Sequence, residues 1–369
     1  MLPPMRGGLP DHTARLAIQL SQHFDITVIT SVGATPQSEY RVEPVIEQWA
    51  DTRPLEKAIA IQAVDSPILW QYVPHMYGRG GVNRELPRLM SRLRRRGKRQ
   101  IVIAHEIAAG LSWRPHWLWF ALNHRWQWQA IVRVADAIPI STERWVEQWK
   151  LRLPEQAHKF SVLPSPSSIP LQPVIGGHAA RWRSARQLSA ETRVLAYFGT
   201  VSPAKQLPWV ISAWQAAQTT GAPTALAIIG AAPTLEIPSS LQALYRPLGF
   251  LSAPEVSYAL SATDVLCLPF VDGVSERRTT LMAGLDHSVA ITGTYGHNTG
   301  TTLKGTTCLT LCSATDREAF VRQTREMITR TEHRQAQGAE GKKLHDQRFS
   351  WSVVTKALVE RISNVAIGG

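Results

Sequence analysis

The chain has 369 residues, a length that exceeds what one hydrophobic core usually supports and therefore favours two domains. Its 44% hydrophobic and 18% charged residues are typical of a globular protein, and no apolar run approaches a membrane-spanning length. Three cysteines argue against a disulfide framework or a metal cage, and the start MLPPMRGG has no apolar signal core, so we expect a cytoplasmic protein.

The formal charge of +12 is spread over the chain. Residues 1–175 hold 21 Lys and Arg against 14 Asp and Glu, and the remainder holds 19 against 14. Such a charge favours anionic partners such as nucleotides and acidic lipid surfaces, whereas the even spread and the lack of a recognition motif argue against nucleic acid. Seven basic residues and no acidic residue lie between Arg88 and Arg99, a pattern as typical of a solvated helix end before Gly97 as of a membrane-surface contact.

The first part of the chain predicts helices that alternate with strands. A helix is expected to start at Pro10 and Asp11, after a Gly-Gly turn. Apolar runs predict strands at residues 26–30, 101–104 and 137–140, with helices before Gly97 and over residues 117–134. Only MLPPM precedes Arg6, so either the strand that normally precedes such a turn is missing or the true start lies upstream.

The segment 163–178 contains several prolines and two adjacent glycines and is predicted to be a linker. A second alternation follows, with strands predicted at residues 193–199 and 225–230 and helices at 208–218 and 254–262. Residues 317–345 are polar and predicted helical, and the last helix is predicted to gather six apolar residues on one face: Phe349, Val353, Val354, Ala357, Leu358 and Ile362. The predicted fold class is α/β, with two doubly wound Rossmann-like lobes.

The stretch 264–294 predicts a strand, a turn, a helix and a second strand. Its apolar run at residues 265–268 is typical of a strand buried on both faces, and a helix follows over residues 279–285. Ser275, Arg277 and Arg278 fall where that helix begins. Unpaired backbone N–H groups at a helix start, together with two guanidinium groups, suit a phosphate group. The alternative is that both arginines pair with Asp272 and Glu276 at the helix end.

Four places carry a resemblance to a known family: GGLPDHTARLA with its DITVIT strand, His105-Glu106 after a strand, FGTVSPAKQL in the second lobe, and the stretch 264–294. In order and spacing they resemble the retaining glycosyltransferases of the GT-B architecture, family 4 (group 1). The helix that begins RFSW resembles the terminal crossover of that family. The resemblance implies an acceptor-side lobe over residues 1–168, a linker over 169–188, a nucleotide-sugar lobe over 189–346, and a helix over 347–369 that packs back on the first lobe.

The resemblance also implies roles for individual residues. Gly7 and Gly8 match the loop that closes over the donor diphosphate, and Lys205 matches the cation that neutralises this diphosphate as it leaves. His105 matches a histidine close to the transferred sugar, with His12 and Glu106 on the acceptor side. Thr200 to Ser202 stand where the family has an Arg, so Arg277 or Arg278 is expected to supply the second positive charge. Seven further donor-binding residues are implied: Gly199, Gly249, Phe250, Gly273, Val274, Ser275 and Thr280.

The acidic pair of the family is where this sequence departs from the pattern. Two glutamates with seven residues between them align with Asp272 and Thr280. Asp272 is expected to orient sugar hydroxyls as a carboxylate that only accepts hydrogen bonds, while Thr280 makes a weaker contact to a ribose hydroxyl. Glu276 is a candidate substitute. The sequence has no Asp-x-Asp motif, and the resemblance implies neither a metal nor another cofactor.

One aromatic segment, WRPHWLWFALNHRWQWQ, contains five tryptophans: Trp113, Trp117, Trp119, Trp126 and Trp128. Packing in a core or a lobe interface is the favoured interpretation, because large rings bury much area and because Trp117 and Trp119 do not share a helical face. The alternative is a sugar-stacking platform or an interfacial membrane contact beside Arg88 to Arg99. In either case the segment is the candidate for shaping the acceptor site.

The predicted function is metal-independent, retaining transfer of a hexosyl unit from a nucleotide sugar, with UDP-glucose or a related UDP-sugar as the expected donor. The expected acceptor is a saccharide or lipid-linked saccharide in polysaccharide or envelope glycan synthesis, which would bring a peripheral contact with the inner face of the membrane. One alternative is a non-catalytic or partner-dependent subunit that binds nucleotide. The second alternative is a sugar-nucleotide epimerase or a phosphorylase on the same architecture.

Overall fold

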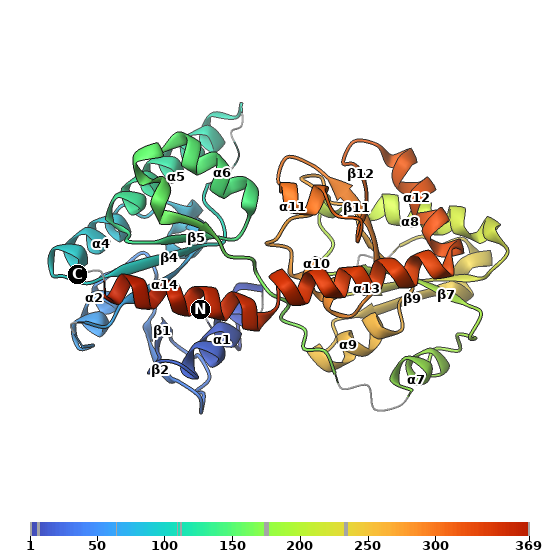
Figure 1. Cartoon of the computed structure of the whole chain (residues 1–369), viewed down its shortest axis with the longest axis horizontal. Helices are drawn as coiled ribbons and strands as arrows, with labels where there is room; N and C mark the ends of the chain where they lie inside the picture. The colour runs from blue at the N-terminus through green and yellow to red at the C-terminus, as the bar shows by residue number, and fades with distance from the viewer. Residues whose placement is uncertain are drawn as a thin grey trace. The chain divides into compact units, whose positions relative to one another are not determined.

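The structure is a computed structural model that describes residues 2–5, 8–63, 65–108, 110, 113–172, 177–231 and 235–367. The chain divides into two compact units (Figure 1). The N-terminal unit comprises Met1–Pro164 and Val354–Gly369, and the C-terminal unit comprises Ser165–Val353. Both units consist of parallel strands with helices packed on them, so the predicted α/β class is confirmed.

The C-terminal unit contains one six-stranded parallel sheet in the order β9-β8-β7-β10-β11-β12. Its strands are β7 (Arg193–Phe198), β8 (Thr224–Ile229), β9 (Tyr245–Gly249), β10 (Val265–Leu268), β11 (Ala290–Tyr295) and β12 (Thr310–Ser313). Counted along this unit, the order is the doubly wound one, in which the progression of strands reverses between the first and the fourth. Strands β8 and β10 are buried along their whole length, as expected for strands covered on both faces.

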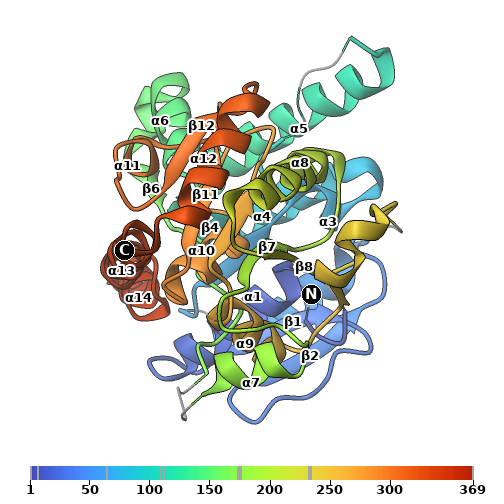
Figure 2. The ribbon, with the colours of Figure 1, turned by 90° about the vertical axis from the view of Figure 1, so that its right-hand side faces the viewer.

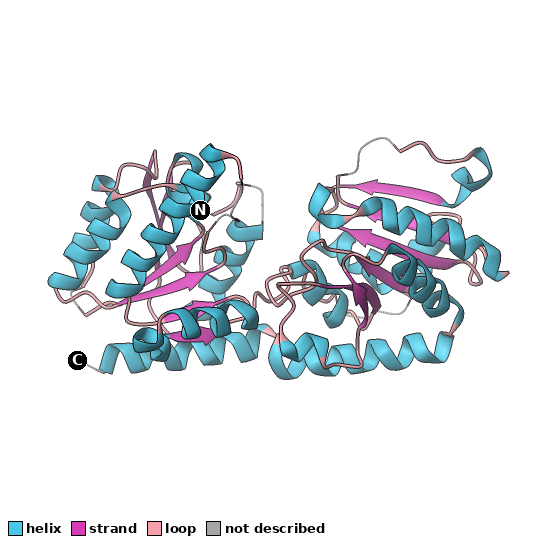
Figure 3. Ribbon diagram, turned by 90° about the horizontal axis from the view of Figure 1, so that it is seen from above, coloured by secondary structure: helices cyan, strands magenta, loops and turns pink. Residues whose placement is uncertain are grey.

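Helices cover both faces of this sheet (Figure 3). Leu266 and Leu268 of β10 belong to the core that includes α9 and α10, whereas Val265 and Cys267 belong to the core that includes α8 and α12. The helices are α7 (His178–Ser184), α8 (Leu207–Ala217), α9 (Ala253–Ser261), α10 (Thr279–Asp286), α11 (Thr301–Lys304), α12 (Arg317–Thr329) and α13 (Thr331–Arg348). The helical prediction for residues 317–345 is confirmed, with a break between α12 and α13 at Arg330.

The N-terminal unit has its described strands in two separate parallel sheets, one of β1 and β2 and one in the order β3-β4-β5-β6. The strands are β1 (Thr27–Ser31), β2 (Arg41–Ile46), β3 (Ile68–Tyr72), β4 (Gln100–Ala104), β5 (Ile138–Ile140) and β6 (Phe160–Val162). The helices are α1 (Gly8–Ser21), α2 (Arg53–Ala60), α3 (Pro74–Tyr77), α4 (Glu85–Arg95), α5 (Pro115–Val134) and α6 (Glu143–Arg152). The predicted helices and strands of this part coincide with α1, β1, α4, β4, α5 and β5 to within two residues where both ends were predicted.

A cavity of about 240 Å³ lies along the facing edges of the two sheets. Residues 26–29 at β1 and residues 68–71 at β3 line it, and α1 contributes Leu16 and Leu20. Because consecutive rather than alternate residues line the cavity, the backbone edges of both strands face it. In the C-terminal unit β7 occupies the corresponding place in the middle of the sheet, and the long helix α8 follows it along the chain. The cavity therefore lies where a strand preceding α1 would join both sheets into one.

Helix α14 (Trp351–Ile367) belongs to both units, since its residues through Val353 fall in the C-terminal unit and those from Val354 in the N-terminal unit. Four of the residues predicted for the apolar face are buried, namely Phe349, Val354, Leu358 and Ile362. The prediction is wrong for Ala357, which is exposed. The buried face of α14 carries Val354, Leu358 and Ile362, which are four residues apart, together with Thr355. Ala357 lies outside this face.

Candidate functional site

The C-terminal sheet offers a ligand site at the carboxyl ends of β7 and β10, where the strand order reverses. One loop follows β7 from Gly199 to Gln206, and another follows β10 through Asp272. The Val271 N–H donates to the Ala204 carbonyl at 3.0 Å and joins the two loops. Most of the donor-binding residues predicted from the sequence lie on these loops.

Glycines keep the backbone open at the carboxyl ends of three neighbouring strands. Gly199, Gly230 and Gly249 follow or end β7, β8 and β9, and their φ angles of 112°, 119° and 66° favour glycine. A Cβ on Gly230 would lie 2.7 Å from the Gly199 carbonyl oxygen, closer than any side chain tolerates. Nothing fills the space beside Gly249, and the next residue, Phe250, is 70% exposed. Gly230 was not predicted, although a glycine directly after an apolar strand was a usable signal.

Lys205 places an ammonium group over this glycine backbone. A Cβ on Gly199 would overlap Lys205 Nζ, so any side chain at this position would displace the lysine ammonium from the Gly199 backbone. Burial, and then the charge of Arg278, lower the pKa of Lys205 to about 8. Within the described ranges no carboxylate pairs with this ammonium. An anionic ligand would stabilise the charged form and raise the pKa again.

Asp272 is largely buried and accepts hydrogen bonds on both carboxylate oxygens. Arg277 donates to Oδ2 at 2.9 Å, Arg278 to Oδ1 at 2.5 Å, and the Asn298 amide to Oδ2 at 2.9 Å. Burial alone would raise the pKa of Asp272, but Arg278, Asn298 and Arg277 together lower it. The carboxylate thus holds two guanidinium groups, as the alternative interpretation of this stretch predicts, in addition to any contact with a ligand.

Arg278 brings a second positive charge to the site. Its guanidinium carbon lies 4.3 Å from the centroid of the Phe270 ring, a cation–π arrangement that fixes its orientation. Arg278 precedes α10, and Thr280 lies in the first turn of that helix. The Thr280 methyl group is 3.5 Å from the position that a Cβ on Gly199 would take. Lys205, Arg278 and Thr280 therefore gather around the Gly199 backbone.

The turn between β10 and α10 is buried rather than open to solvent. Gly273, Val274 and Ser275 are all buried, and Ser275 Oγ has no hydrogen-bond partner among the described residues. The Val274 N–H donates to the Thr294 carbonyl at 2.8 Å. A Cβ on Gly273 would overlap the Gly296 backbone. These three residues, predicted to bind the donor, shape the turn from within the unit.

The loop after β11 contributes residues that were not predicted. The Asn298 N–H donates to the Asp272 carbonyl at 3.0 Å, in addition to the bond from its side chain to the carboxylate. Thr299 Oγ1 accepts from the Gly296 N–H at 3.0 Å and closes the loop. Asn298 and Thr299 are buried. An asparagine in a polar loop carries no sequence signal, so only the fold identifies it as support for Asp272.

The predicted residues of the N-terminal unit form a separate group. His105 follows β4, and its ring centroid lies 4.9 Å from that of His12 on α1. His105 Nε2 is 2.7 Å from Gln71 Oε1. Burial lowers the pKa of His12 to about 4, and burial together with His12 lowers the pKa of His105 well below its usual value. Both rings are therefore neutral at pH 7. Gly8 begins α1, whereas Gly7 lies outside the described residues.

The aromatic segment does not pack as predicted. Trp128 is fully buried, but Trp113, Trp117, Trp119 and Trp126 are 102%, 43%, 51% and 50% exposed. The core-packing interpretation is wrong for these four residues. Trp119 and Trp126 lie on the side of α5 opposite Trp128, which faces the core, whereas Trp113 precedes the helix and Trp117 lies in its first turn. In the neighbouring basic run, Gly97 follows the end of α4 with φ of 80°, which confirms a helix end there.

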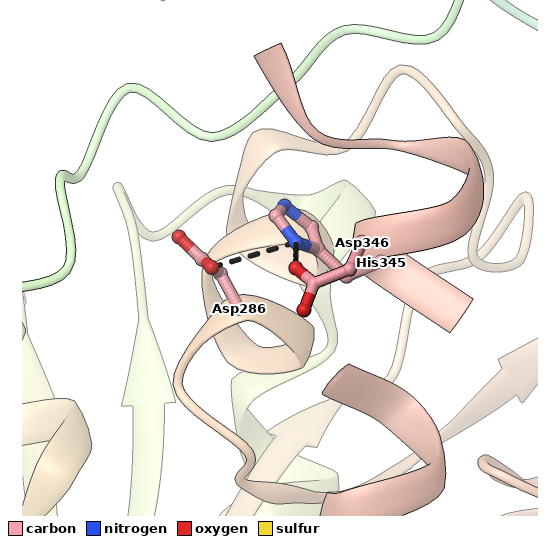
Figure 4. A group of neighbouring side chains, drawn as sticks. All are labelled: Asp286, His345 and Asp346. Atoms are coloured by element: carbon pink, nitrogen blue, oxygen red, sulfur yellow. Dashed lines mark hydrogen bonds and ion pairs between the residues drawn. The ribbon is translucent and has the colours of Figure 1, made fainter. Parts of the chain in front are cut away.

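A second polar cluster lies at the opposite end of α10 (Figure 4). Asp286, the last residue of α10, is 3.4 Å from His345 Nδ1, which is 3.1 Å from Asp346 Oδ1. His and Asp are metal ligands in principle, but the Lys342 ammonium is 3.4 Å from Asp286 and also pairs with Asp346. The lysine pairs with both carboxylates, so the cluster joins α10 to α13 as an ion-pair network.

No family model matches the sequence, and no curated protein matches it significantly. Among the described residues, no helix is long and apolar enough to cross a membrane.

Solved structures do match the fold. Sucrose-phosphate synthase from Thermosynechococcus elongatus has a TM-score of 0.74 at 12% identity, over 98% of this chain and 94% of that chain. HepE from Anabaena in complex with UDP has a TM-score of 0.71 at 14% identity, over 98% of both chains. WaaG, a glycosyltransferase involved in lipopolysaccharide biosynthesis, has a TM-score of 0.63 at 14% identity, over 99% and 97%. The chain therefore has the GT-B fold of two Rossmann-like lobes that these glycosyltransferases share.

Proposed function

We propose that the protein is a glycosyltransferase that uses a UDP-sugar, with UDP-glucose or a related hexose as donor. The arrangement of Lys205, Arg278 and Thr280 around the open Gly199 backbone carries this proposal. It combines two cations, an accessible backbone and the first turn of a helix at a topological switch point, which together suit a diphosphate. HepE has been solved in complex with UDP and with UDP-glucose, which supports the choice of donor.

Neutralisation of the leaving diphosphate is the main chemical task of such a site. Arg278 is permanently charged and is held by Asp272 and Phe270. Lys205, whose pKa is about 8 without ligand, becomes fully charged when an anion binds beside it. We propose that these two cations do the work that a divalent ion does in other transferases, so that transfer is independent of metal.

The remaining features of the proposal rest on the family resemblance. Transfer proceeds with retention, and the leaving phosphate accepts the proton of the attacking hydroxyl. His105, neutral and oriented by Gln71, donates or accepts a hydrogen bond at the transferred sugar. The acceptor is a saccharide or lipid-linked saccharide in glycan assembly. We propose that Gly7 and Gly8 belong to the loop that closes over the donor diphosphate. His12 and Glu106 contact the acceptor.

The contacts of Asp272 change one part of the mechanism. Both of its oxygens bind guanidinium or amide groups, so we propose that it positions Arg277 and Arg278 in addition to any contact with the sugar. The same observation favours the second candidate function, a subunit that binds nucleotide without turnover. In that case the cations bind the diphosphate while the Asp272 carboxylate serves only to hold its guanidinium and amide partners.

Binding and turnover separate the two candidates. UDP-, GDP- and ADP-hexoses are tested by calorimetry for binding and by nucleotide release for donor hydrolysis. We expect the UDP-sugar to bind and to be turned over, and Lys205→Ala to weaken binding about 10- to 100-fold, the effect of one charge-assisted hydrogen bond. Lys343→Ala, which alters an exposed lysine paired with Glu340, is the control. Binding without turnover supports the non-catalytic subunit, and absence of binding to all three excludes both candidates.

A further inference from the structure

The N-terminal half of α5 leaves a group of large apolar side chains in solvent. Six residues form this group, which we name the α5 surface: Trp113, Trp117, Leu118, Trp119, Leu122 and Trp126. Leu118, Trp119, Leu122 and Trp126 fall on one side of the helix by their spacing. The other side, with Trp128 and Ile131, is buried in the core of the N-terminal unit. Figure 2 shows the N-terminal turns of α5 extending beyond the strands of that unit.

The α5 surface contains more large exposed apolar side chains than isolated exposed residues account for. Trp119, Leu122 and Trp126 are 51%, 54% and 50% exposed, and Trp113 is exposed completely. Scattered single apolar residues are common on protein surfaces, but four large apolar residues on one side of a helix, Leu118, Trp119, Leu122 and Trp126, are typical of a contact surface. The buried side of α5 holds the five members from Trp117 to Trp126 in place, whereas Trp113 precedes the helix.

The surroundings of the α5 surface are strongly basic. Residues 84–135 contain eleven Lys and Arg but only two acidic residues, Glu85 and Glu106. Four arginines of this range pair with Glu56 or Asp136 outside it, namely Arg92, Arg94, Arg96 and Arg99. Arg84 donates to Asn123 of α5 at 3.4 Å, which brings an exposed guanidinium beside the surface. Arg114 is exposed within the surface itself, and Arg88 of α4 has a side chain that is 65% exposed.

The combination of tryptophan and arginine identifies the partner. A second copy of this chain would bring two basic surfaces together, which like-charge repulsion opposes. An interfacial lipid layer satisfies both components, since tryptophan rings favour the headgroup level and arginines favour anionic phosphates. We propose that the α5 surface binds the protein peripherally to an anionic lipid membrane. This binding does not depend on the chemistry at Lys205, although it would bring the enzyme to the lipid-linked acceptor of the proposed function.

Sedimentation with lipid vesicles tests the proposal on the full chain without donor. Vesicles of phosphatidylcholine alone are compared with vesicles that also contain phosphatidylglycerol, at low and high salt. We expect binding to the anionic vesicles, weaker binding at high salt, and a blue shift of tryptophan fluorescence on binding. Absence of binding to anionic vesicles, or equal binding to both kinds at all salt concentrations, would overturn the proposal.

Two sets of variants locate the contact. Trp119→Ser with Trp126→Ser should lower the partition coefficient at least about tenfold, because both rings lose their interfacial burial. Arg84→Glu with Arg114→Glu should lower it more than about 25-fold, since each arginine near an anionic surface contributes a factor of about five. Ile61→Ser with Leu151→Ser alters exposed apolar residues outside α5, and Arg322→Glu with Arg325→Glu alters exposed arginines of the C-terminal unit. These controls should bind as the unaltered protein does.

Light scattering provides the remaining check. A monomer in solution, with a melting temperature unchanged by the α5 substitutions, supports a membrane contact that does not stabilise the fold. If the unaltered protein is a dimer that these substitutions dissociate, the surface is an interface between copies and the proposal fails. Equal loss of vesicle binding in the controls would also contradict it.

Discussion

The two units follow one plan but differ in how completely they carry it out. The C-terminal unit has a continuous six-stranded sheet with two strands buried along their whole length, and it gathers cations at the carboxyl ends of its strands. The N-terminal unit has its described strands in two sheets along one cavity, and its buried polar pair, His12 and His105, is neutral. The difference teaches where each unit can act on a ligand: the C-terminal unit presents cations at its strand ends, whereas the neutral histidine pair of the N-terminal unit can only exchange hydrogen bonds.

The largest expected effect concerns the charges of the C-terminal unit. Asp272→Ala leaves two largely buried guanidinium groups without their carboxylate, and we expect a loss of about 3–5 kcal/mol in the free energy of unfolding. Urea denaturation of this unit measures it. Asp346→Ala removes a carboxylate that is 53% exposed and should cost no more than about 1 kcal/mol. Equal losses for both variants would show that Asp272 does not organise the site.

The second prediction concerns the neutral pair of the N-terminal unit. The unfolded chain binds a proton at His12 below a pKa of about 6.5, whereas the folded chain does so only below about 4. Stability is therefore lost as the pH falls through this window, by about 3 kcal/mol from this residue. His12→Gln should reduce the difference in unfolding free energy between pH 7 and pH 4.5 accordingly, whereas His158→Gln, at an exposed position, should not. An unchanged pH dependence in His12→Gln would mean that the ring is charged in the fold.

The third prediction addresses the cavity that β1 and β3 line. A designed apolar strand fused ahead of Leu2, long enough to pair with β1 and β3, should bury two or three branched side chains in the cavity. After the cost of ordering the added residues, we expect a gain of about 1–2 kcal/mol in the stability of the N-terminal unit. The measurement is the denaturation midpoint, with a polar strand of equal length as control. No difference between the two extensions would show that the cavity is not a strand position.

The smallest effect is expected at the exposed tryptophans. Trp126→Ala should change the free energy of unfolding by no more than about 0.5 kcal/mol, because the ring is half exposed and makes its contacts elsewhere than in the core. Trp128→Ala, two residues along the same helix, should cost about 3–5 kcal/mol because that ring is fully buried. Thermal unfolding of both variants checks the pair. A large loss for Trp126→Ala would indicate that the aromatic segment packs as first predicted.

Local patterns were sufficient for most of the fold. Apolar runs such as residues 265–268 located the buried strands, and the start of α10 was placed at Thr279 because a Gly-containing turn precedes an apolar segment. The short strands β2, β3, β6, β9 and β12 were not predicted, since segments such as Arg41–Ile46 and Tyr245–Gly249 mix polar, apolar and proline residues. Their place in a sheet is set by pairing with neighbours, which sequence alone does not show.

The charged residues of the site could be predicted from the sequence, but the residues that hold them in place could not. Arg278 was identified because a cation beside a helix start suits phosphate, whereas Lys205 was identified only through the family resemblance. Asn298 was missed because its contact with Asp272 spans 26 residues and depends on two loops meeting at the carboxyl ends of β10 and β11. The exposure of Trp119 and Trp126 was also missed, because a helix rich in aromatic residues is usually buried. In each case the deciding contact, or its absence, is long-range.

Helix α14 imposes an order on synthesis. Val354, Leu358 and Ile362 are buried in the N-terminal unit, yet they follow the whole C-terminal unit along the chain. The unit made first therefore waits, with an apolar surface uncovered, until residues 354–367 have left the ribosome, while the unit made second already has all of its strands. Such delayed closure is where a multidomain chain is most exposed to aggregation and to chaperones. The N-terminal unit, although it is synthesised first, should therefore complete its folding last.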